Sequence, residues 1–250
     1  MKFHFRTLSA AMLTAIVCGA LLSAAQAADK KPQASVQTVD TGSFGVFVKG
    51  ERVATESFTI QQQSGTSVIK AQLKQTAGGD ASQKCHLEIT SSGELIRYDW
   101  SQSSGGSLSV VPNNEFLLEK ITAPSSSKSA EQPFLMPNTS AILDNNFFVH
   151  RQVLVWRYLA AACKPQGGGF KCQQDPGDFG AIIPQDRISM HVRVELVGKE
   201  KVSVRGTDRE LMRLNLKGDN FDWALWVDEQ DQFKLIRVAV PADNTEVVRD

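Results

Sequence analysis

The sequence contains few of the residues from which most catalytic sites are built. Its 250 residues include only four histidines and four cysteines, and His4 and Cys18 lie in the first 27 residues. It has no G-x-S-x-G segment, no cysteine and histidine spacing typical of zinc sites, and no glycine loop that could cradle a phosphate. We therefore predict no catalytic residue, no bound metal and no cofactor, and we expect that the protein is not an enzyme.

The three remaining histidines do not change this prediction. His191 lies on the polar face of an expected strand, and His150 lies beside Arg151 in an expected helix, where packing or surface exposure explains it. His86 directly follows Cys85, and adjacent residues of a strand point to opposite faces of a sheet, so the two are poor joint metal ligands. A hydrolase built on residues without a recognisable motif stays as the third functional alternative.

Neither sign of charge is in excess. The chain has 27 basic and 27 acidic residues, and it lacks the basic block that would neutralise nucleic-acid phosphates. We therefore expect no nucleic-acid partner. Long apolar runs are also missing after the N-terminal segment, so we expect no transmembrane segment in the remainder of the chain.

The N-terminal segment has the three parts of a secretory signal peptide. Lys2 and Arg6 precede an apolar run from Leu8 to Leu22. The A-x-A sequence Ala25-Gln26-Ala27 follows this run. The run is shorter than the ~20 residues of a spanning helix, and Cys18 lacks the small preceding residue of a lipobox. We predict cleavage after Ala27. Without Lys2 and Arg6, the other 223 of the 250 residues have a net charge of −2, and we expect them in the periplasm or outside the cell.

From Ser43 onward, apolar and polar residues alternate with a period of two, which is typical of strands with one dry face. The small, polar residues 28–42 predict a flexible leader. Lys49-Gly50-Glu51 is a turn sequence between the first two expected strands. We predict a single β-rich domain over residues 43–250, although a chain of this length can also hold two small domains.

The alternation is clearest in the C-terminal third. It runs from Ile188 to Leu196 and returns between residues 212 and 240. Turn sequences at Gly198-Lys199, Gly206-Thr207-Asp208 and Gly218-Asp219-Asn220 separate the expected strands. Strands joined by tight turns are antiparallel neighbours, because parallel strands need a long crossover. The pattern therefore predicts an antiparallel meander.

One segment between the two β regions has helical spacing. Asp144 can cap this helix, and Lys164-Pro165 should end it. The apolar residues that recur at helical spacing are Phe147, Phe148, Leu154, Val155, Tyr158 and Leu159, and Val153 and Trp156 broaden the stripe. We predict a helical insert at about residues 144–163 and a loop over residues 164–185.

Three cysteines follow Ala27. Cys163 and Cys172 flank a loop rich in glycine, and export favours disulfide formation. We predict a Cys163–Cys172 disulfide; a redox-active pair is a weaker alternative, because the spacing is not C-x-x-C. Cys85 is then either buried and inert or paired between chains.

Some expected strands are apolar on both faces. Trp223 and Trp226 fall on opposite faces of one strand, as do Phe47 and Val48. Such a sheet is covered by a helix on one side or encloses a cavity.

Two segments resemble known families. The segment Gly45 to Phe58 (GVFVKGERVATESF) is similar to the opening hairpin of uncharacterised secreted bacterial families, and Ala224 to Val238 (ALWVDEQDQFKLIRV) is similar to a later hairpin of theirs. The second segment also resembles the LolA/LolB-like lipoprotein-carrier fold. This resemblance implies a mainly β protein: a curved antiparallel sheet or incomplete barrel with one long helix packed on or across its open side. The motifs are short and structural, so they imply a fold and no ligand-contact residue.

A curved sheet with a helical lid leaves an apolar concavity, which is the usual form of a small-molecule site. We therefore predict a periplasmic binding or carrier protein for an apolar ligand, such as a lipid or an acyl chain. The expected ligand contacts are Phe147, Leu154, Tyr158, Trp100 and Trp223. The alternative is an envelope protein-protein interaction module without a small ligand. The sequence leaves open whether the helix fills the concave side or covers it as a lid.

Overall fold

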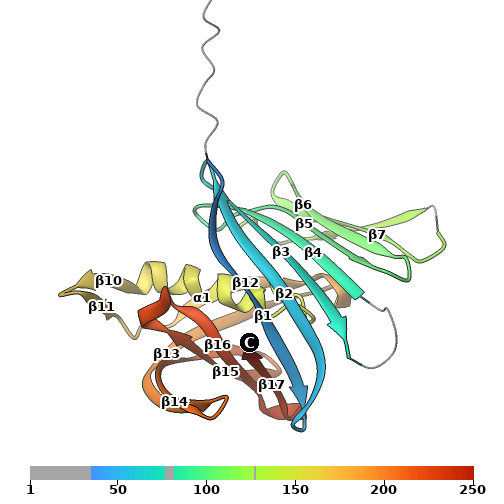
Figure 1. Cartoon of the computed structure of the whole chain (residues 1–250). Coiled ribbons are helices and arrows are strands. Elements are labelled where there is room, and N and C mark those ends of the chain that lie inside the picture. The colour runs from blue at the N-terminus through green and yellow to red at the C-terminus, as the bar shows by residue number, and fades with distance from the viewer. Residues whose placement is uncertain (1–34, 77–81, 127) are drawn as a thin grey trace, which may run out of the picture. The chain divides into compact units, whose positions relative to one another are not determined.

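One large antiparallel sheet dominates the computed structural model, which describes residues 35–76, 82–126 and 128–250 (Figure 1). The expected signal peptide, residues 1–27, lies outside the described residues. Within them, fifteen strands pair in the order β8-β7-β6-β5-β4-β3-β2-β1-β17-β16-β15-β14-β13-β12-β9. Neighbouring strands are antiparallel except for β9 and β12, which are parallel. The fold class predicted from the sequence is therefore confirmed.

The sheet consists of two meanders. The N-terminal meander comprises β1 (Gln37–Val48), β2 (Glu51–Gln63), β3 (Thr66–Gln75), β4 (Ser82–Thr90), β5 (Leu95–Gln102), β6 (Ser107–Asn113), β7 (Phe116–Thr122) and β8 (Ser129–Phe134). The C-terminal meander comprises β12 (Gly177–Ile183), β13 (Ile188–Val204), β14 (Thr207–Gly218), β15 (Phe221–Asp228), β16 (Lys234–Val240) and β17 (Thr245–Arg249). The strands β1 and β17 join the meanders, with Phe44 opposite Arg249.

Between the meanders lie the short strand β9 (Ala141–Ile142), the helix α1 (Val149–Ala162) and a hairpin of β10 (Cys163–Gln166) and β11 (Gly169–Cys172). Three single-turn 3₁₀ helices, η1 (Pro184–Asp186), η2 (Glu229–Asp231) and η3 (Pro241–Asp243), lie at turns between strands of the C-terminal meander. The edge strands β8 and β9 do not pair with each other, so the sheet is curved but not closed into a barrel.

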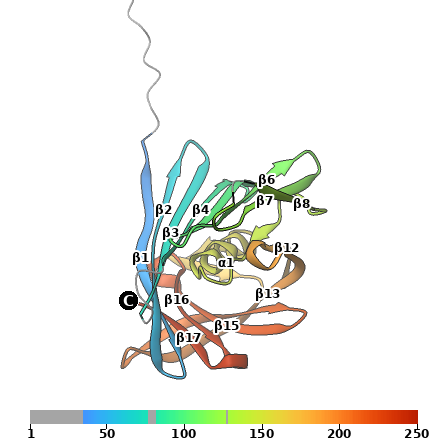
Figure 2. The same ribbon diagram turned by 90° about the vertical axis from the view of Figure 1, so that its right-hand side faces the viewer.

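The sheet curves around α1, which lies on its concave side (Figure 2). Register shifts occur between β1 and β2, β4 and β5, β13 and β14, and β15 and β16. Such bulges bend a strand and increase its twist, which accounts for the curvature. Alternate residues of the strands face inward and form a main core with the helix. Trp223 packs against this core.

A second, smaller core lies on the convex face. It contains Val202, Val204, Leu211, Trp226 and Ile236. Val202 and Val204 lie at the end of β13, and Leu211 lies in the first half of β14. Trp226 and Ile236 come from β15 and β16. Trp223 and Trp226 therefore belong to different cores, which confirms that β15 is apolar on both faces.

Buried polar groups attach α1 to the sheet. Both carboxylate oxygens of Glu56, on β2, accept hydrogen bonds from the helix start, from Phe148 N at 2.6 Å and Val149 N at 3.1 Å. Gln152 donates to the Asp40 carboxylate at 2.7 Å and accepts from Leu235 N at 2.9 Å. Asp40 also receives two hydrogen bonds from Arg249. These contacts come from β1, β2, β16 and β17, so the helix is fixed to the middle of the sheet.

Two boundary predictions on the N-terminal side of the helix are wrong. The flexible leader was expected up to residue 42, but β1 begins at Gln37. Its inward positions include the polar Asp40, which hides the strand pattern until Phe44. The helix begins at Val149 rather than Asp144, and Asp144 does not cap it. The Asp144 carboxylate instead accepts from Asn146 N and from Tyr98, while Glu56 binds the first helical amides.

Two further predictions fail on the C-terminal side. The expected turn at Gly198-Lys199 is absent, because β13 continues through it to Val204 with a register shift between Leu196 and Gly198. Gly198 has a φ of 143°, which suits it to this bulge. The expected loop at 164–185 contains most of the β10–β11 hairpin and β12. Its glycines and prolines separate strands that are too short to show a period.

Candidate functional site

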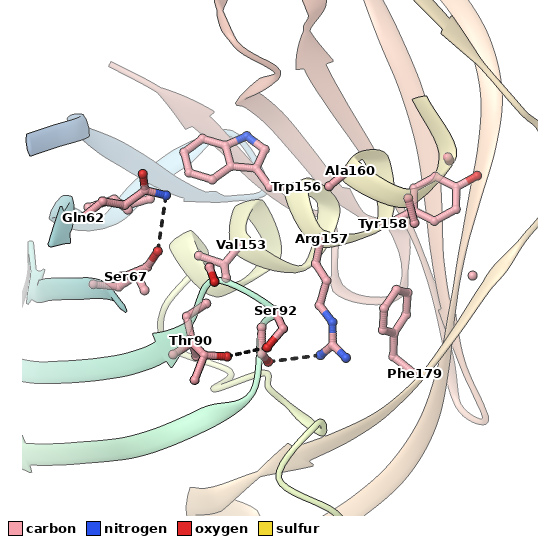
Figure 3. A pocket seen from close by; sticks show the side chains of 18 of the residues that line it. Gln62, Ser67, Thr90, Ser92, Val153, Trp156, Arg157, Tyr158, Ala160 and Phe179 are labelled. Atoms are coloured by element: carbon pink, nitrogen blue, oxygen red, sulfur yellow. Dashed lines mark hydrogen bonds between the residues drawn. The ribbon is translucent and has the colours of Figure 1, made fainter. Parts of the chain in front are cut away.

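The helix α1 has two different faces. Its deeply buried residues include Leu154, Val155, Tyr158 and Leu159, which belong to the main core. The residues Val153, Trp156, Arg157, Ala160 and Ala161 form a second stripe at helical spacing and are half-buried or exposed. This second stripe lines a pocket (Figure 3).

The pocket has a volume of about 770 Å³. Besides the helix, its walls are the concave face of the sheet, with Ile60, Ile69 and Ile89, and the segment 173–179, which runs into β12 and includes Phe179. The volume lies within the range of about 300–1,000 Å³ that is usual for small-molecule sites. The apolar side chains come from three separate parts of the chain, so tertiary folding creates this pocket.

The pocket lining also includes polar side chains. Gln62 donates to the Ser67 hydroxyl at 3.4 Å, and the hydroxyls of Thr90 and Ser92 lie 2.8 Å apart. Arg157 projects from α1 beside the ring of Phe179, with its guanidinium carbon 5.2 Å from the ring centroid. Figure 3 shows Arg157 between Val153 and Phe179, near Thr90 and Ser92.

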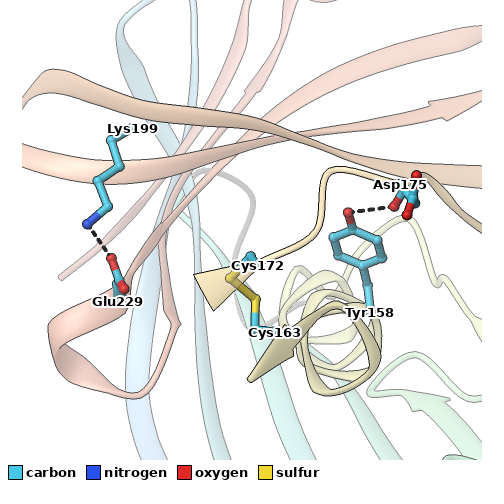
Figure 4. The surroundings of a disulfide bond; sticks show 6 residues. All are labelled: Tyr158, Cys163, Cys172, Asp175, Lys199 and Glu229. Carbon is cyan, nitrogen blue, oxygen red and sulfur yellow. Dashed lines mark hydrogen bonds and ion pairs between the residues drawn. A yellow bond between two sulfur atoms is a disulfide. The ribbon is translucent and has the colours of Figure 1, made fainter. Parts of the chain in front are cut away.

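A disulfide lies next to the pocket. Cys163 and Cys172 are bonded, which confirms the predicted pair, and they join the end of α1 to the end of β11 (Figure 4). Their chain neighbours Ala162 and Gln173 line the pocket. Phe170, between the two cysteines, packs against Phe233 with ring centroids 4.8 Å apart. The disulfide therefore fixes the start of the segment that forms the third wall.

Trp156 connects this wall region to the C-terminal meander. Its indole Nε1 donates to the Phe233 carbonyl at 2.8 Å. Tyr158, one turn before the disulfide, donates its hydroxyl to the Asp175 carbonyl at 3.0 Å. Both aromatic side chains are thus held by a hydrogen bond at their polar end, as buried Trp and Tyr residues usually are.

Two other concavities are lined differently. One of about 910 Å³ is larger, but most of its lining side chains are polar residues on the convex face of the N-terminal meander, such as Lys70, Lys84 and Ser109. Another, of about 700 Å³, lies beside Phe148, Trp223 and β1–β3. We select the pocket beside α1 because its apolar walls come from a helix, a sheet and a third segment.

The structure does not bring the five predicted ligand contacts together. Phe147 and Leu154 are only 0% and 2% exposed and belong to the packed core. Tyr158 lines the pocket beside α1, and Trp223 lines the pocket beside Phe148. Trp100 lies opposite Cys85 and Leu108 in the sheet and packs against the main core. Trp223 also stacks with the Arg151 guanidinium at 4.9 Å. Their role in ligand binding stays a prediction.

Several pocket residues were not expected from the sequence. Val153 and Trp156 were recognised as part of a broad apolar stripe, and that width was the available signal. Arg157 and Phe179 had none: a single arginine on a helix forms no motif, and Phe179 lay in an expected loop. Ile60 alternates with polar neighbours like any strand residue, so the local sequence does not link it to the helix.

Cys85 and His150 place a thiol beside an imidazole in the main core. The sulfur of Cys85 lies 3.6 Å from His150 Nε2, and the residues are 5% and 1% exposed. Burial raises the pKa of the Cys85 thiol and lowers the pKa of His150 to about 3. Both groups are therefore neutral at pH 7 and shielded from solvent. The described residues also contain no group of three or more His, Cys, Asp or Glu side chains placed to hold a metal.

Within the described ranges, no helix has the length and apolar character that crossing a membrane would require. Fold and pocket together define a mainly β protein with an open, curved sheet and an apolar cavity beside its helix.

Comparisons with known proteins add little to this description. No protein-family model matches the chain, and no curated protein matches it. Among solved structures, it is similar to a β-barrel-like protein of domain of unknown function DUF1849 from Brucella abortus, with a TM-score of 0.49 and 6% sequence identity. The similarity covers 84% of this chain and 94% of the other. It does not identify the chain as a LolA/LolB-like carrier, and that resemblance stays a prediction.

Proposed function

We propose that this protein binds or carries an apolar ligand, a lipid or an acyl chain, in the pocket beside α1. The observation that carries the proposal is the apolar wall formed by Val153, Trp156 and Phe179 around a space of about 770 Å³. Well-packed interiors leave few voids larger than a water molecule. This space instead has the size and the mostly apolar, concave lining of a small-molecule site, which supports a ligand there.

The same proposal places the protein in the cell envelope. The Cys163–Cys172 disulfide supports an oxidising compartment, and the N-terminal sequence is typical of export. A carrier with a LolA/LolB-like arrangement of sheet and helix is the finer form of this proposal, and the helix beside the pocket supports it.

A fluorescent acyl-chain probe, titrated into delipidated protein, tests the proposal. We expect saturable binding to the unmodified protein. The variant Ala160→Trp should lose it, because Ala160 is exposed on the stripe that lines the pocket and an indole there fills the space. Ala242→Trp, on the exposed turn η3, is the matched control and should bind like the unmodified protein.

Absence of saturable binding by any acyl probe would refute this function. The result would then favour the envelope interaction module. A specific observation makes that module the second candidate: Leu135, directly after the edge strand β8, is 89% exposed. Crosslinking at residue 135 in envelope extracts would test it.

A further inference from the structure

Arg157 is a partly buried cation without an acidic partner. None of the ion pairs among the described residues includes it, and its two hydrogen bonds go from Nη1 to backbone carbonyls, Thr139 O at 2.7 Å and Gly93 O at 3.4 Å. Carbonyls orient a guanidinium but do not neutralise its charge. Glu94 is the acidic residue whose charge acts on it, and burial nevertheless lowers the pKa of Arg157.

The surroundings hold Arg157 in place. Phe179 lies under the guanidinium at 5.2 Å. Gly93 leaves space for the side chain: a Cβ at that position would lie 2.9 Å from Arg157 Cδ and 3.0 Å from Nε. Nε and Nη2 donate no hydrogen bond within the described part of the chain, and neither is a buried unpaired atom. The guanidinium is therefore oriented in advance, with donors left for another group.

The charged residues of the pocket lining do not pair with each other. Among the described residues that line the pocket, Arg157 and Asp175 are the charged ones. Asp175 is exposed, and it lies beside Tyr158, whose hydroxyl bonds its carbonyl. It does not pair with Arg157. A ligand with a negative group would match the guanidinium, whereas a neutral ligand would leave Arg157 without an ion-pair partner.

We infer that the pocket takes an amphiphile with one acyl chain and an anionic head group, a carboxylate or a phosphate. The head group binds Arg157, and the chain lies along Val153, Trp156 and Ile60. Charge-assisted hydrogen bonds from arginine to carboxylate or phosphate are among the stronger ones in proteins. This inference rests on the proposed function and specifies the ligand of the same site.

A head-group series at constant chain length tests it. Dodecanoate, dodecyl phosphate, dodecanol and dodecyltrimethylammonium are titrated by displacement of the acyl probe, each below its micelle concentration. We expect the two anions to bind about tenfold or more tightly than dodecanol, which corresponds to about 1.4 kcal/mol, and the cation to bind most weakly. The better of the two anions identifies the head group. Inorganic phosphate alone should not displace the probe.

Variants isolate the role of the guanidinium. Arg157→Gln should reduce the affinity for the anions about tenfold or more and leave that for dodecanol unchanged; Arg157→Lys should retain part of the preference. Arg205→Gln, at an exposed turn, is the matched control. If Arg157→Gln does not fold, Ala161→Glu replaces it, because a glutamate four residues after Arg157 on the same stripe supplies an internal carboxylate. Ala242→Glu controls for the added charge.

Different failures have different meanings. Equal affinity for dodecanoate and dodecanol, with no effect of Arg157→Gln or Ala161→Glu, would overturn this inference and leave the apolar-ligand function intact. Preference for the cation, or displacement by inorganic phosphate alone, would also overturn it. If no member of the series displaces the probe and the probe itself does not bind, the proposed function fails.

Discussion

At the scale of single residues, a buried glutamate determines how α1 begins. Glu56 is fully buried, and it accepts two hydrogen bonds from the first amides of the helix. Burial raises its pKa to about 8, although those hydrogen bonds and the nearby Arg151 act in the opposite direction. The protonation state of this residue therefore differs between the folded and unfolded protein over a wide range of pH.

We expect Glu56 to make the protein less stable as the pH rises from about 4.5 to about 8. In this window the folded state retains a proton that the unfolded state has released, so a rising pH favours unfolding, by up to about 1.4 kcal/mol per pH unit. Glu56→Gln keeps an acceptor oxygen but has no charge to titrate. Chemical denaturation at pH 5, 6.5 and 8 should show a flatter pH dependence for Glu56→Gln. Parallel curves for the two proteins would contradict the raised pKa.

Adjacent residues of α1 should have separable roles. Leu154 is 2% exposed and belongs to the main core, whereas Val153 lines the pocket. Leu154→Ala should lower the free energy of unfolding by about 2–5 kcal/mol and leave acyl-probe affinity nearly unchanged. Val153→Ala should cost less stability and weaken probe binding. If Leu154→Ala weakens probe binding and Val153→Ala does not, the ligand contacts the face of α1 that is packed against the main core in this structure.

The apolar stripe of α1 could be predicted from the sequence, but the contact of the helix with Glu56 could not. The apolar stripe of α1 was predicted because its spacing is local, and Val153 and Trp156 were recognised as widening it. The contact with Glu56 could not be found, because it joins positions 92 and 93 residues apart and a glutamate among the alternating residues of β2 has no special signature. Glutamate side chains are rarely buried unless they are paired or hydrogen-bonded, so the sequence pattern predicts a surface position for Glu56.

At the scale of elements, the disulfide hairpin is the part most directly joined to the pocket. It links the end of α1 to the segment 173–179, which forms one wall. Cys163→Ser with Cys172→Ser should lower the free energy of unfolding by roughly 2–3 kcal/mol, because the unfolded chain gains freedom. It should also weaken acyl-probe binding, because the wall is no longer fixed at its start.

Peptide mapping and titration check this prediction together. Non-reducing digests of the unmodified protein should contain the linked Cys163 and Cys172 peptides. The variant Cys85→Ser, which removes the buried free cysteine, distinguishes loss of the disulfide from loss of a thiol. Unchanged probe affinity in the double variant would show that the hairpin does not shape the pocket.

Elements with strong local signals were predicted well, and elements defined by their neighbours were not. The predicted turn at Lys49-Gly50 has positive φ values at both residues, a conformation that glycine adopts readily. Gly198 carries the same signal but lies in a bulge of the continuous strand β13, since β14 pairs with β13 on both sides of it. Whether a glycine ends a strand or bends it depends on the partner strand, which the local sequence does not contain.

At the scale of the whole molecule, the export prediction concerns residues outside those described. Protein isolated from the envelope should begin at Ala28, because the apolar run ends at the A-x-A sequence before it. N-terminal sequencing or intact-mass measurement checks this. A mature protein that still contains Leu8 to Leu22, or carries a lipid on Cys18, would contradict the prediction.

The pairing of β1 with β17 also affects how the chain acquires its structure. These central strands come from opposite ends of the described chain, with Phe44 opposite Arg249, and Arg249 also binds Asp40. Such distant pairing must overcome a large loop-closure entropy and forms slowly. During synthesis, a chain that has not yet produced β17 lacks the partner of β1 and cannot complete the middle of its sheet. The nascent polypeptide therefore stays incompletely folded until β17 emerges, and such a state would suit the export that the N-terminal sequence predicts.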